Sequence, residues 1–259
     1  MTVLSVNLNK IALLRNSREG QRPSVVEFAR QAITAGAEGI TVHPRPDQRH
    51  IRASDVPMLA TMLKTEYPHI EFNIEGNPVA SANASGYPGF ISLVEASKPA
   101  QATLVPDSDD QLTSDHGWDL SVAQPQLRAH IEACQKAGAR VSLFMDPVVE
   151  HMAIAADHGA DRVEFYTGPY AEVYWQYGEA DQRTQDCYRQ FAMAAEAALK
   201  AGLGINAGHD LDQQNLPLFS NLPGLAEVSI GHAIICEALV DGFSNTVAAY
   251  AKILQSTDG

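Results

Sequence analysis

The chain has 259 residues, which suits one α/β barrel of about 250 residues, and no Ser/Gly/Pro-rich linker divides it, so we expect a single domain over residues 1–259. Hydrophobic residues make up 45% of the chain, yet no apolar run approaches the roughly 18 residues of a membrane helix, which argues against a membrane partner. The formal net charge of −13 argues against a nucleic-acid partner, because an acidic surface repels phosphate backbones.

The cysteines and the N-terminus indicate the compartment. Cys134, Cys187 and Cys236 lie far apart and lack metal-ligand spacing, so we expect no disulfide framework. The first residues alternate like a strand and lack the basic flank and cleavage site of a signal peptide. Both features favour a cytoplasmic protein.

One local pattern recurs along the chain: a helix end, a glycine stop and a short β-rich run. It is clearest around Gly36, Gly138 and Gly159, and looser around Gly202. Strands are expected near residues 3–8, 38–43, 69–74, 101–105, 140–145, 161–166, 203–206 and 225–230. Helices are expected at 24–35, 54–66, 88–97, 124–137, 148–158, 183–201 and 232–254.

Eight αβ units in a chain of this length predict a closed (β/α)8 TIM barrel. A doubly wound open sheet is the alternative, but no GxGxxG follows the first strand, so the dinucleotide-binding fingerprint is missing. Residues 76–88 and 106–123 are rich in Gly, Pro, Asn, Asp and Ser and are expected to form long loops over one barrel face.

Polar residues gather at the expected carboxyl ends of the strands, where barrel enzymes hold their active sites. These residues are Asn7, Asn9, His43, Arg45, Arg49, His50, Glu71, Asn73, Glu75, Asp146, Glu164, Asn206, His209, Gly231 and His232. Barrel interiors are normally filled by Val, Ile and Leu, so this many polar residues favour a functional site over a structural explanation.

Acid–base groups stand out within that set. Glu71 and Glu164 are mid-strand carboxylates that are costly to bury without a partner or a task. His43 shares a strand face with the cation Arg45. We expect His43, Glu71, Glu164 and His209 to point into one cavity at the carboxyl-terminal mouth of the barrel.

Phosphate is the ligand charge that the sequence favours. Gly231 lies between a strand and a helix, which aims free N–H groups and the positive helix end at an anion. Residues 206–210 repeat this arrangement one strand earlier, and barrels often bind phosphate after strands 7 and 8.

The lysines and the metal-ligand residue types bear on two further chemistries. Only Lys10 among the lysines lies near a strand end, which argues against a Schiff-base lysine, and no cofactor is predicted. A metal site built from His43, Glu71, Glu164 and His209 stays open as an alternative, although no close-spaced ligand pair supports it.

Seven ordered segments resemble the pyridoxine 5′-phosphate synthase family over nearly the whole chain. They are VNLNKIALLRNSR (6–18), GITVHPR (39–45), LVP (104–106), VSLF (141–144), EFYTG (164–168), NAGH (206–209) and IGHAII (230–235). The resemblance implies a cofactor-free condensation of 1-deoxy-D-xylulose 5-phosphate with 3-amino-2-oxopropyl phosphate. The ring closure would give pyridoxine 5′-phosphate and release inorganic phosphate and water.

The resemblance also implies roles for individual residues. His43 and Glu71 match proton acceptors, His209 matches a proton donor, and Glu164 matches the carboxylate that stabilises the transition state. The positions that match contacts to the aminoketone phosphate are Asn7, Arg18, Asp210, Gly231 and His232. Those that match contacts to the deoxyxylulose phosphate are Arg45, His50 and Thr113, and Asn9 and Lys10 occupy the positions of a further sugar-phosphate contact.

The chain departs from the family pattern in places. Asn9-Lys10 replaces a common Asp-His, Asp210 replaces a common glycine, and the stretch between Glu71 and Pro99 is longer than in many relatives. The family implies a homo-octamer. Two other classes stay open: a sugar-phosphate isomerase, epimerase or aldolase, with or without a metal, and a non-catalytic barrel that binds phosphometabolites.

Overall fold

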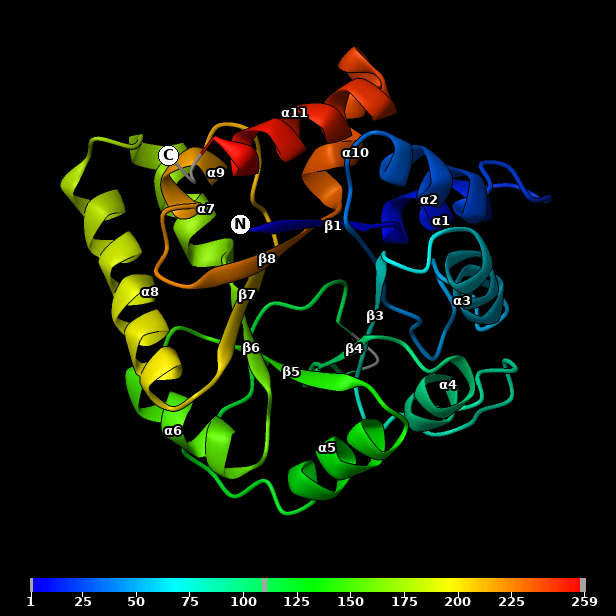
Figure 1. Ribbon diagram of the computed structural model, residues 1–259, viewed down its shortest axis with the longest axis horizontal. Helices are drawn as coiled ribbons and strands as arrows, with labels where there is room; N and C mark the ends of the chain where they lie inside the picture. The colour runs from blue at the N-terminus through cyan, green and yellow to red at the C-terminus, as the bar shows by residue number, and fades with distance from the viewer. Residues whose placement is uncertain (1, 109–110, 257–259) are drawn as a thin grey trace.

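The computed structural model describes residues 2–108 and 111–256 as a closed barrel of parallel strands ringed by helices (Figure 1). The strands pair in chain order, and β8 closes onto β1. Their bounds are β1 (Val3–Asn7), β2 (Gly39–Val42), β3 (Glu71–Gly76), β4 (Gln101–Leu104), β5 (Arg140–Met145), β6 (Arg162–Tyr166), β7 (Gly204–Gly208) and β8 (Leu225–Ile230). The predicted (β/α)8 barrel is confirmed.

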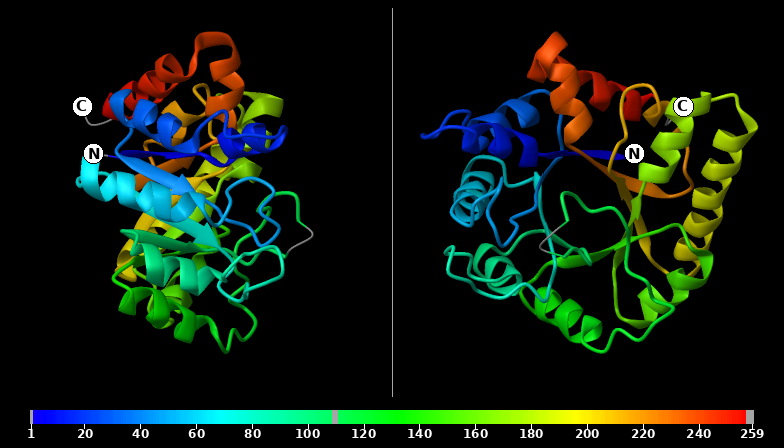
Figure 2. Two further views of the ribbon diagram at one scale, coloured as in Figure 1. Left: turned by 90° about the vertical axis from the view of Figure 1, so that its right-hand side faces the viewer. Right: turned by 180° about the vertical axis from the view of Figure 1, so that it is seen from behind.

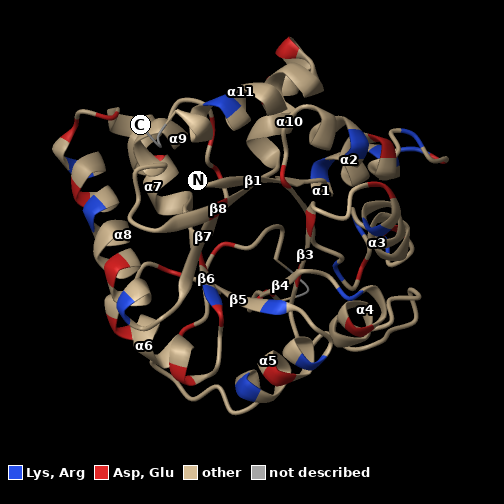
Figure 3. Cartoon of the chain, in the orientation of Figure 1, with Lys and Arg blue, Asp and Glu red and all other residues tan. Residues whose placement is uncertain are grey.

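The helices mostly follow the expected ranges. Their bounds are α1 (Asn9–Asn16), α2 (Val25–Thr34), α3 (Asp55–Glu66), α4 (Phe90–Ser97), α5 (Leu127–Lys136), α6 (Val149–Asp157), α7 (Gly168–Tyr177), α8 (Gln182–Lys200), α9 (Leu216–Phe219), α10 (His232–Asp241) and α11 (Phe243–Gln255). In the described parts of the chain, no helix combines the length and apolar character needed to cross a bilayer. Acidic and basic positions are interspersed along the outer helices, as α8 illustrates (Figure 3).

Three helical predictions need correction. The single helix expected at 232–254 is divided at Gly242, whose φ of 81° is left-handed and lies between α10 and α11. The strand-like alternation of the first residues ends at Asn7, and α1 begins at Asn9. Helix α7 was not expected; it begins at Gly168 with Pro169 in its first turn, a position that suits proline.

The two faces of the barrel strands differ in polarity. Outward residues such as Leu4, Ile40 and Val163 are buried beneath the helices and form the hydrophobic core. Inward residues form a hydrogen-bonded polar interior instead of the usual aliphatic filling. Thr103 on β4, for example, donates to Asn73 on β3 at 3.1 Å and to Glu164 on β6 at 3.3 Å.

Long loops after β2, β3 and β4 protrude together from one end of the barrel (Figure 2, left). The predicted loop at 76–88 contains no helix and is closed by a bridge between Ser81 and Gly89. The described residues of the predicted loop at 106–123 also lack helix and strand. Because parallel strands all end on the same side, these loops stand beside the side chains at the strand ends.

Candidate active site

A cavity of about 350 Å³ opens at the carboxyl ends of the strands. Its walls include acid–base groups, cations and a helix N-terminus. The lining residues are Asn7, Asn9, Lys10, His43, Arg45, His50, Glu75, Val105, Leu112, Thr113, Ser114, Phe144, Glu164, His209, Asp210, Leu211, Ser229, Ile230, Gly231, His232 and Ala233.

His43 follows the last residue of β2 and is buried between two carboxyl groups. Its Nδ1 lies 3.9 Å from Glu75 Oε2, and its Nε2 lies 4.0 Å from Asp107 Oδ2. The Asn9 side chain accepts the backbone N–H of His43 at 2.9 Å and so holds the strand end in place. Burial, followed by the charges of Arg45, His50 and Arg49, lowers the pKa of His43 well below its ordinary value. The imidazole is therefore neutral at pH 7 and available as a base.

The pKa values of two nearby carboxyl groups, Glu75 and Glu164, are raised rather than lowered. Burial raises the pKa of Glu75, and the neighbouring Asp107 and Glu227 raise it further. Burial also raises the pKa of Glu164 well above its ordinary value, with additional repulsion from Glu75 and Glu227. Buried carboxyls in this state hold protons at neutral pH, so the cavity contains acids beside a neutral base.

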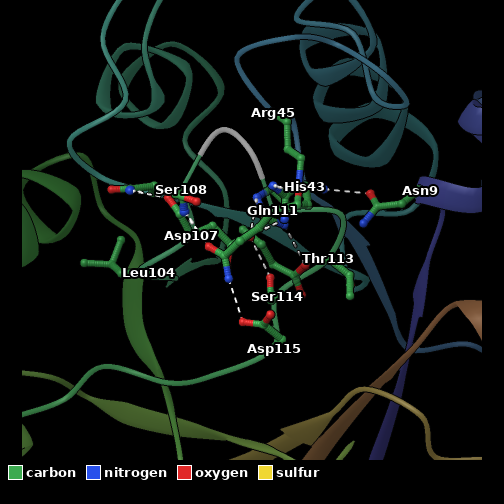
Figure 4. Close-up of polar contacts among 12 residues, drawn as sticks. Asn9, His43, Arg45, Leu104, Asp107, Ser108, Gln111, Thr113, Ser114 and Asp115 are labelled. Atoms are coloured by element: carbon green, nitrogen blue, oxygen red, sulfur yellow. Dashed lines mark hydrogen bonds and ion pairs between the residues drawn. The ribbon is translucent and has the colours of Figure 1, made fainter.

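Arg45 contributes a cation to the same wall (Figure 4). Its guanidinium donates to Asp107 Oδ2 and, at 3.2 Å, to the carbonyl oxygen of Gln111. Ser114 also donates to Asp107 Oδ2, at 2.8 Å. The pair is almost fully buried, so each charge depends on the other.

Asp107 is a site residue that the sequence analysis missed. It comes three residues after the end of β4, behind Pro106, in the one strand end that supplied no polar candidate. A carboxylate directly after a barrel strand was the signal that could have identified it.

His209 and Asp210 form a turn after β7, and both have left-handed φ angles, 85° and 58°. His209 Nδ1 lies 2.7 Å from Asp210 Oδ2, and its Nε2 lies 2.9 Å from the Thr113 hydroxyl. Tyr166 packs edge-on against the imidazole with ring centroids 5.1 Å apart. Both ring nitrogens of His209 thus have a hydrogen-bond partner.

The end of β8 supplies an anion-binding geometry. Gly231 precedes α10, whose first turn contains His232. A Cβ on Gly231 would lie 2.9 Å from Cβ of Asn7, so only glycine permits β8 and β1 to approach this closely. Lys10, in the first turn of α1, lines the same part of the cavity wall.

The cavity brings together all but two of the residues for which the resemblance implied a catalytic or substrate-binding role, and the exceptions are Glu71 and Arg18. Four further strand-end residues do not line it either: Arg49, Asn73, Asp146 and Asn206. The expectation that Glu71 faces this cavity is wrong: it is the first residue of β3, at the opposite end of the barrel, and its carboxylate pairs with Arg140 at 2.5 Å. Glu75, on the same strand face, reaches the cavity instead. Arg18 is exposed in the segment after α1 and does not line the cavity. The four-residue metal set is likewise not assembled, since Glu71 stands apart.

Known proteins resemble the chain at two levels. The family described as pyridoxal phosphate biosynthesis protein PdxJ matches residues 4–256. A pyridoxine 5′-phosphate synthase from Xanthomonas oryzae pv. oryzae is 55% identical and covers 99% of this chain and 98% of its own. One from Xylella fastidiosa is 51% identical and covers 99% and 96%.

Solved structures share the fold at much lower identity. A thiamine phosphate pyrophosphorylase from Pyrococcus furiosus has a TM-score of 0.61 at 11% identity, and the match covers 100% of this chain and 97% of that chain. A phosphoribosyl anthranilate isomerase from Thermus thermophilus has a TM-score of 0.57 at 15% identity, with 99% and 100% covered. These likenesses support the barrel alone.

Proposed function

The chain belongs to the PdxJ family of pyridoxal phosphate biosynthesis proteins, and from this we propose that it condenses 1-deoxy-D-xylulose 5-phosphate with 3-amino-2-oxopropyl phosphate into pyridoxine 5′-phosphate. Inorganic phosphate and water leave during ring closure. One observation carries the proposal from the structure: a neutral imidazole, His43, lies between buried carboxyl groups in a cavity that also holds His209.

The reaction needs proton transfers at several different atoms, because an imine must form, water and phosphate must leave, and the ring must close. His43 accepts a proton from substrate, since its lowered pKa leaves the imidazole unprotonated at neutral pH. Glu75 replaces Glu71 as the carboxyl group of β3 in the cavity, and because it is protonated it donates a proton to a substrate atom first and accepts one back in a later step. His209 donates a proton from the opposite wall, and Glu164 stabilises the transition state from beneath.

The two phosphate ends need separate positive sites. Backbone N–H groups of Asp210, Gly231 and His232, together with Asn7 and Arg18, are proposed to bind the aminoketone phosphate. A second group would bind deoxyxylulose phosphate: Asn9, Lys10, Arg45, His50 and Thr113. Arg18 would have to approach the cavity to take part.

The test is product formation by the purified protein. With both substrates present, the protein should release one inorganic phosphate for each ring formed, and neither substrate alone should release any. A sugar-phosphate isomerase would transform a single substrate without releasing phosphate, and a binding barrel would transform neither. Either result would overturn the proposal.

Family membership extends the proposal to assembly and location. A homo-octamer in the cytoplasm is the expected state, and light scattering after gel filtration would measure the assembly. A mass of one or two chains would contradict the octamer. It would not bear on the proposed reaction, which product formation tests separately.

A further inference from the structure

The turn formed by His209 and Asp210 is held in a strained conformation. Left-handed backbone in a residue with a side chain is unfavourable and persists only where the surroundings enforce it. Here Thr167 donates its hydroxyl to the carbonyl oxygens of Gly208 and His209. Asn215 donates to the carbonyl oxygen of Asp210 at 3.0 Å. Since Thr167 and Asn215 are fully buried, the turn is fixed by the core.

The consequence of this turn is a contact between adjacent side chains. Asp210 Oδ2 lies 2.7 Å from His209 Nδ1. The hydrogen bond from His209 lowers the pKa of Asp210, so the carboxylate is ionised at neutral pH. An ionised carboxylate can only accept, and therefore Nδ1 carries the hydrogen. Nε2 is left as the nitrogen that exchanges a proton, and it faces the hydroxyl of Thr113, a cavity-lining residue.

Charge also limits what the Asp210 carboxylate can do. The residue lines a cavity proposed to hold phosphate esters, where a free carboxylate would repel the ligand. The Nδ1–H of His209 donates to this carboxylate instead, and the cation Lys10 lies near enough to favour its negative charge. The backbone N–H stays available for phosphate, whichever residue occupies the position.

We propose that Asp210 is a positioning residue: its carboxylate fixes the Nδ1–H tautomer and the orientation of His209, so that Nε2 alone takes up a proton from one substrate atom and then donates it to another. This inference rests on the proposed function, in which His209 is the proton donor. It assigns a task to the side chain that replaces glycine at this position of the family pattern. The carboxylate–imidazole pair of a catalytic triad works in the same way: the carboxylate accepts the hydrogen of one ring nitrogen, here Nδ1, and leaves the other, here Nε2, to exchange protons.

Asp210→Gly is the sharpest test, because glycine tolerates the φ of 58° and retains the backbone N–H. We expect kcat to fall about 10-fold, equivalent to about 1.4 kcal/mol, while KM for both substrates stays unchanged. In ¹⁵N NMR spectra of histidine-labelled protein, wild-type His209 should show the Nδ1–H form, and the variant should lose it. Asp210→Asn, which keeps the side-chain volume, should lose the same fixed tautomer.

Asp115→Asn is the matched charge control. Asp115 is an exposed carboxylate of the loop after β4, and its partners are Gln111 and His116 rather than His209. This control should keep both kcat and the tautomer. The proposal is overturned by an equal loss in Asp115→Asn, by an unchanged tautomer in Asp210→Gly, or by a raised KM for the aminoketone with normal kcat. Product formation by the wild type tests the proposed function separately, since the NMR readout needs no turnover.

Discussion

At the scale of single residues, His43 and the two carboxyls beneath it carry the protonation states that burial dictates rather than those they would have in water. A neutral imidazole and a protonated Glu75 lie 3.9 Å apart, too far for a direct hydrogen bond. A substrate atom, or a water, between them could receive a proton from one and lose a proton to the other. This arrangement suits a reaction in which protons move between several substrate atoms.

Substitutions of Glu75 and Glu71 should show which glutamate of β3 takes part in catalysis, the one in the cavity or the one at the opposite end of the barrel. Glu75→Gln should lower kcat by about 10²–10⁴-fold, the usual contribution of a group that transfers protons. Glu71→Gln is the matched control: it makes the same chemical change on the same strand, at the opposite barrel end, and kcat should stay close to the wild-type value. Steady-state rates of product formation show which glutamate is needed for catalysis. A large loss of kcat in Glu71→Gln with none in Glu75→Gln would support the role for Glu71 that the resemblance implied.

The glutamate pair also shows what the sequence could predict. Period-two alternation correctly put Glu71, Asn73 and Glu75 on one strand face, but alternation says nothing about depth. Glu71 and Glu75 are four residues apart, so roughly 13 Å of strand separates them. Only the register of β3 against its neighbours decides which one reaches the mouth, and that register depends on packing distant in sequence.

At the scale of elements, a buried ion pair fastens α1 to the segment that follows β2 and carries His50. Arg15 donates to both carboxylate oxygens of Asp55, at 2.6 and 2.9 Å, and both side chains are 2% exposed. Arg15 also donates to the carbonyl oxygen of His50 at 3.1 Å. The last turn of α1 therefore holds the segment that places His50 in the cavity, while its first turn supplies Asn9 and Lys10.

Arg15→Met should destabilise the fold by about 3–5 kcal/mol, because it leaves Asp55 as an uncompensated buried charge. The double variant Arg15→Met/Asp55→Asn should recover part of that loss, since the amide oxygen can still accept the N–H of Arg52. Urea unfolding of the three proteins measures the difference. Equal stability of the single variant and the wild type would show that the pair contributes nothing to the fold.

Element prediction succeeded where glycine stops and apolar runs coincide, and all eight strands lie within two residues of their expected ends. It missed α7 because Gly168 and Pro169 read as loop residues, although proline is favoured in the first turn of a helix. It merged α10 and α11 because the apolar periodicity continues past Gly242. Whether a glycine interrupts such a pattern depends on its φ angle, which the pattern does not contain.

At the scale of the whole molecule, the barrel interior is polar from end to end. Gln101, Asn206 and Arg162 surround Glu227 near the amino-terminal end, and each donates to its carboxyl group at 3.2–3.4 Å. Part of the polarity that suggested a functional site from sequence is therefore this structural network. The sequence predicted the presence of inward polar residues correctly, but could not divide them between the cavity and the barrel filling, because both sets share one strand face.

This interior makes the stability of the fold depend on pH in a defined direction. Burial raises the pKa of Glu227 to about 7, against the opposing charge of Arg162. A group with a raised folded pKa stabilises most below its unfolded value of 4.5, and this contribution is lost as pH rises through about 7. The pKa values of Glu75 and Glu164 are raised as well, which adds to the loss at higher pH.

Two buried histidines affect the pH dependence of stability in the opposite direction, so the loss caused by the carboxyl groups is expressed alone only above a certain pH. Burial lowers the pKa of His43 and His50, so their contribution is present above the unfolded value of 6.5 and is lost as pH falls below it. The two trends oppose each other between about pH 4.5 and 6.5. Above pH 6.5 only the carboxyl effect remains, and the free energy of unfolding should fall between pH 6.5 and 8.

Glu227→Gln should reduce that slope, because the amide cannot ionise and its oxygen can still accept from Gln101 and Asn206. At about 1.4 kcal/mol per pH unit, the variant should gain about 2 kcal/mol on the wild type between pH 5 and 8. Urea unfolding at both pH values measures the free energy of unfolding of each protein. Glu66→Gln is the control, because it removes a titrating carboxyl group that is exposed and lies outside the barrel interior. Parallel pH profiles for wild type and Glu227→Gln would mean that Glu227 is ionised throughout, and that Arg162 and the amides outweigh its burial.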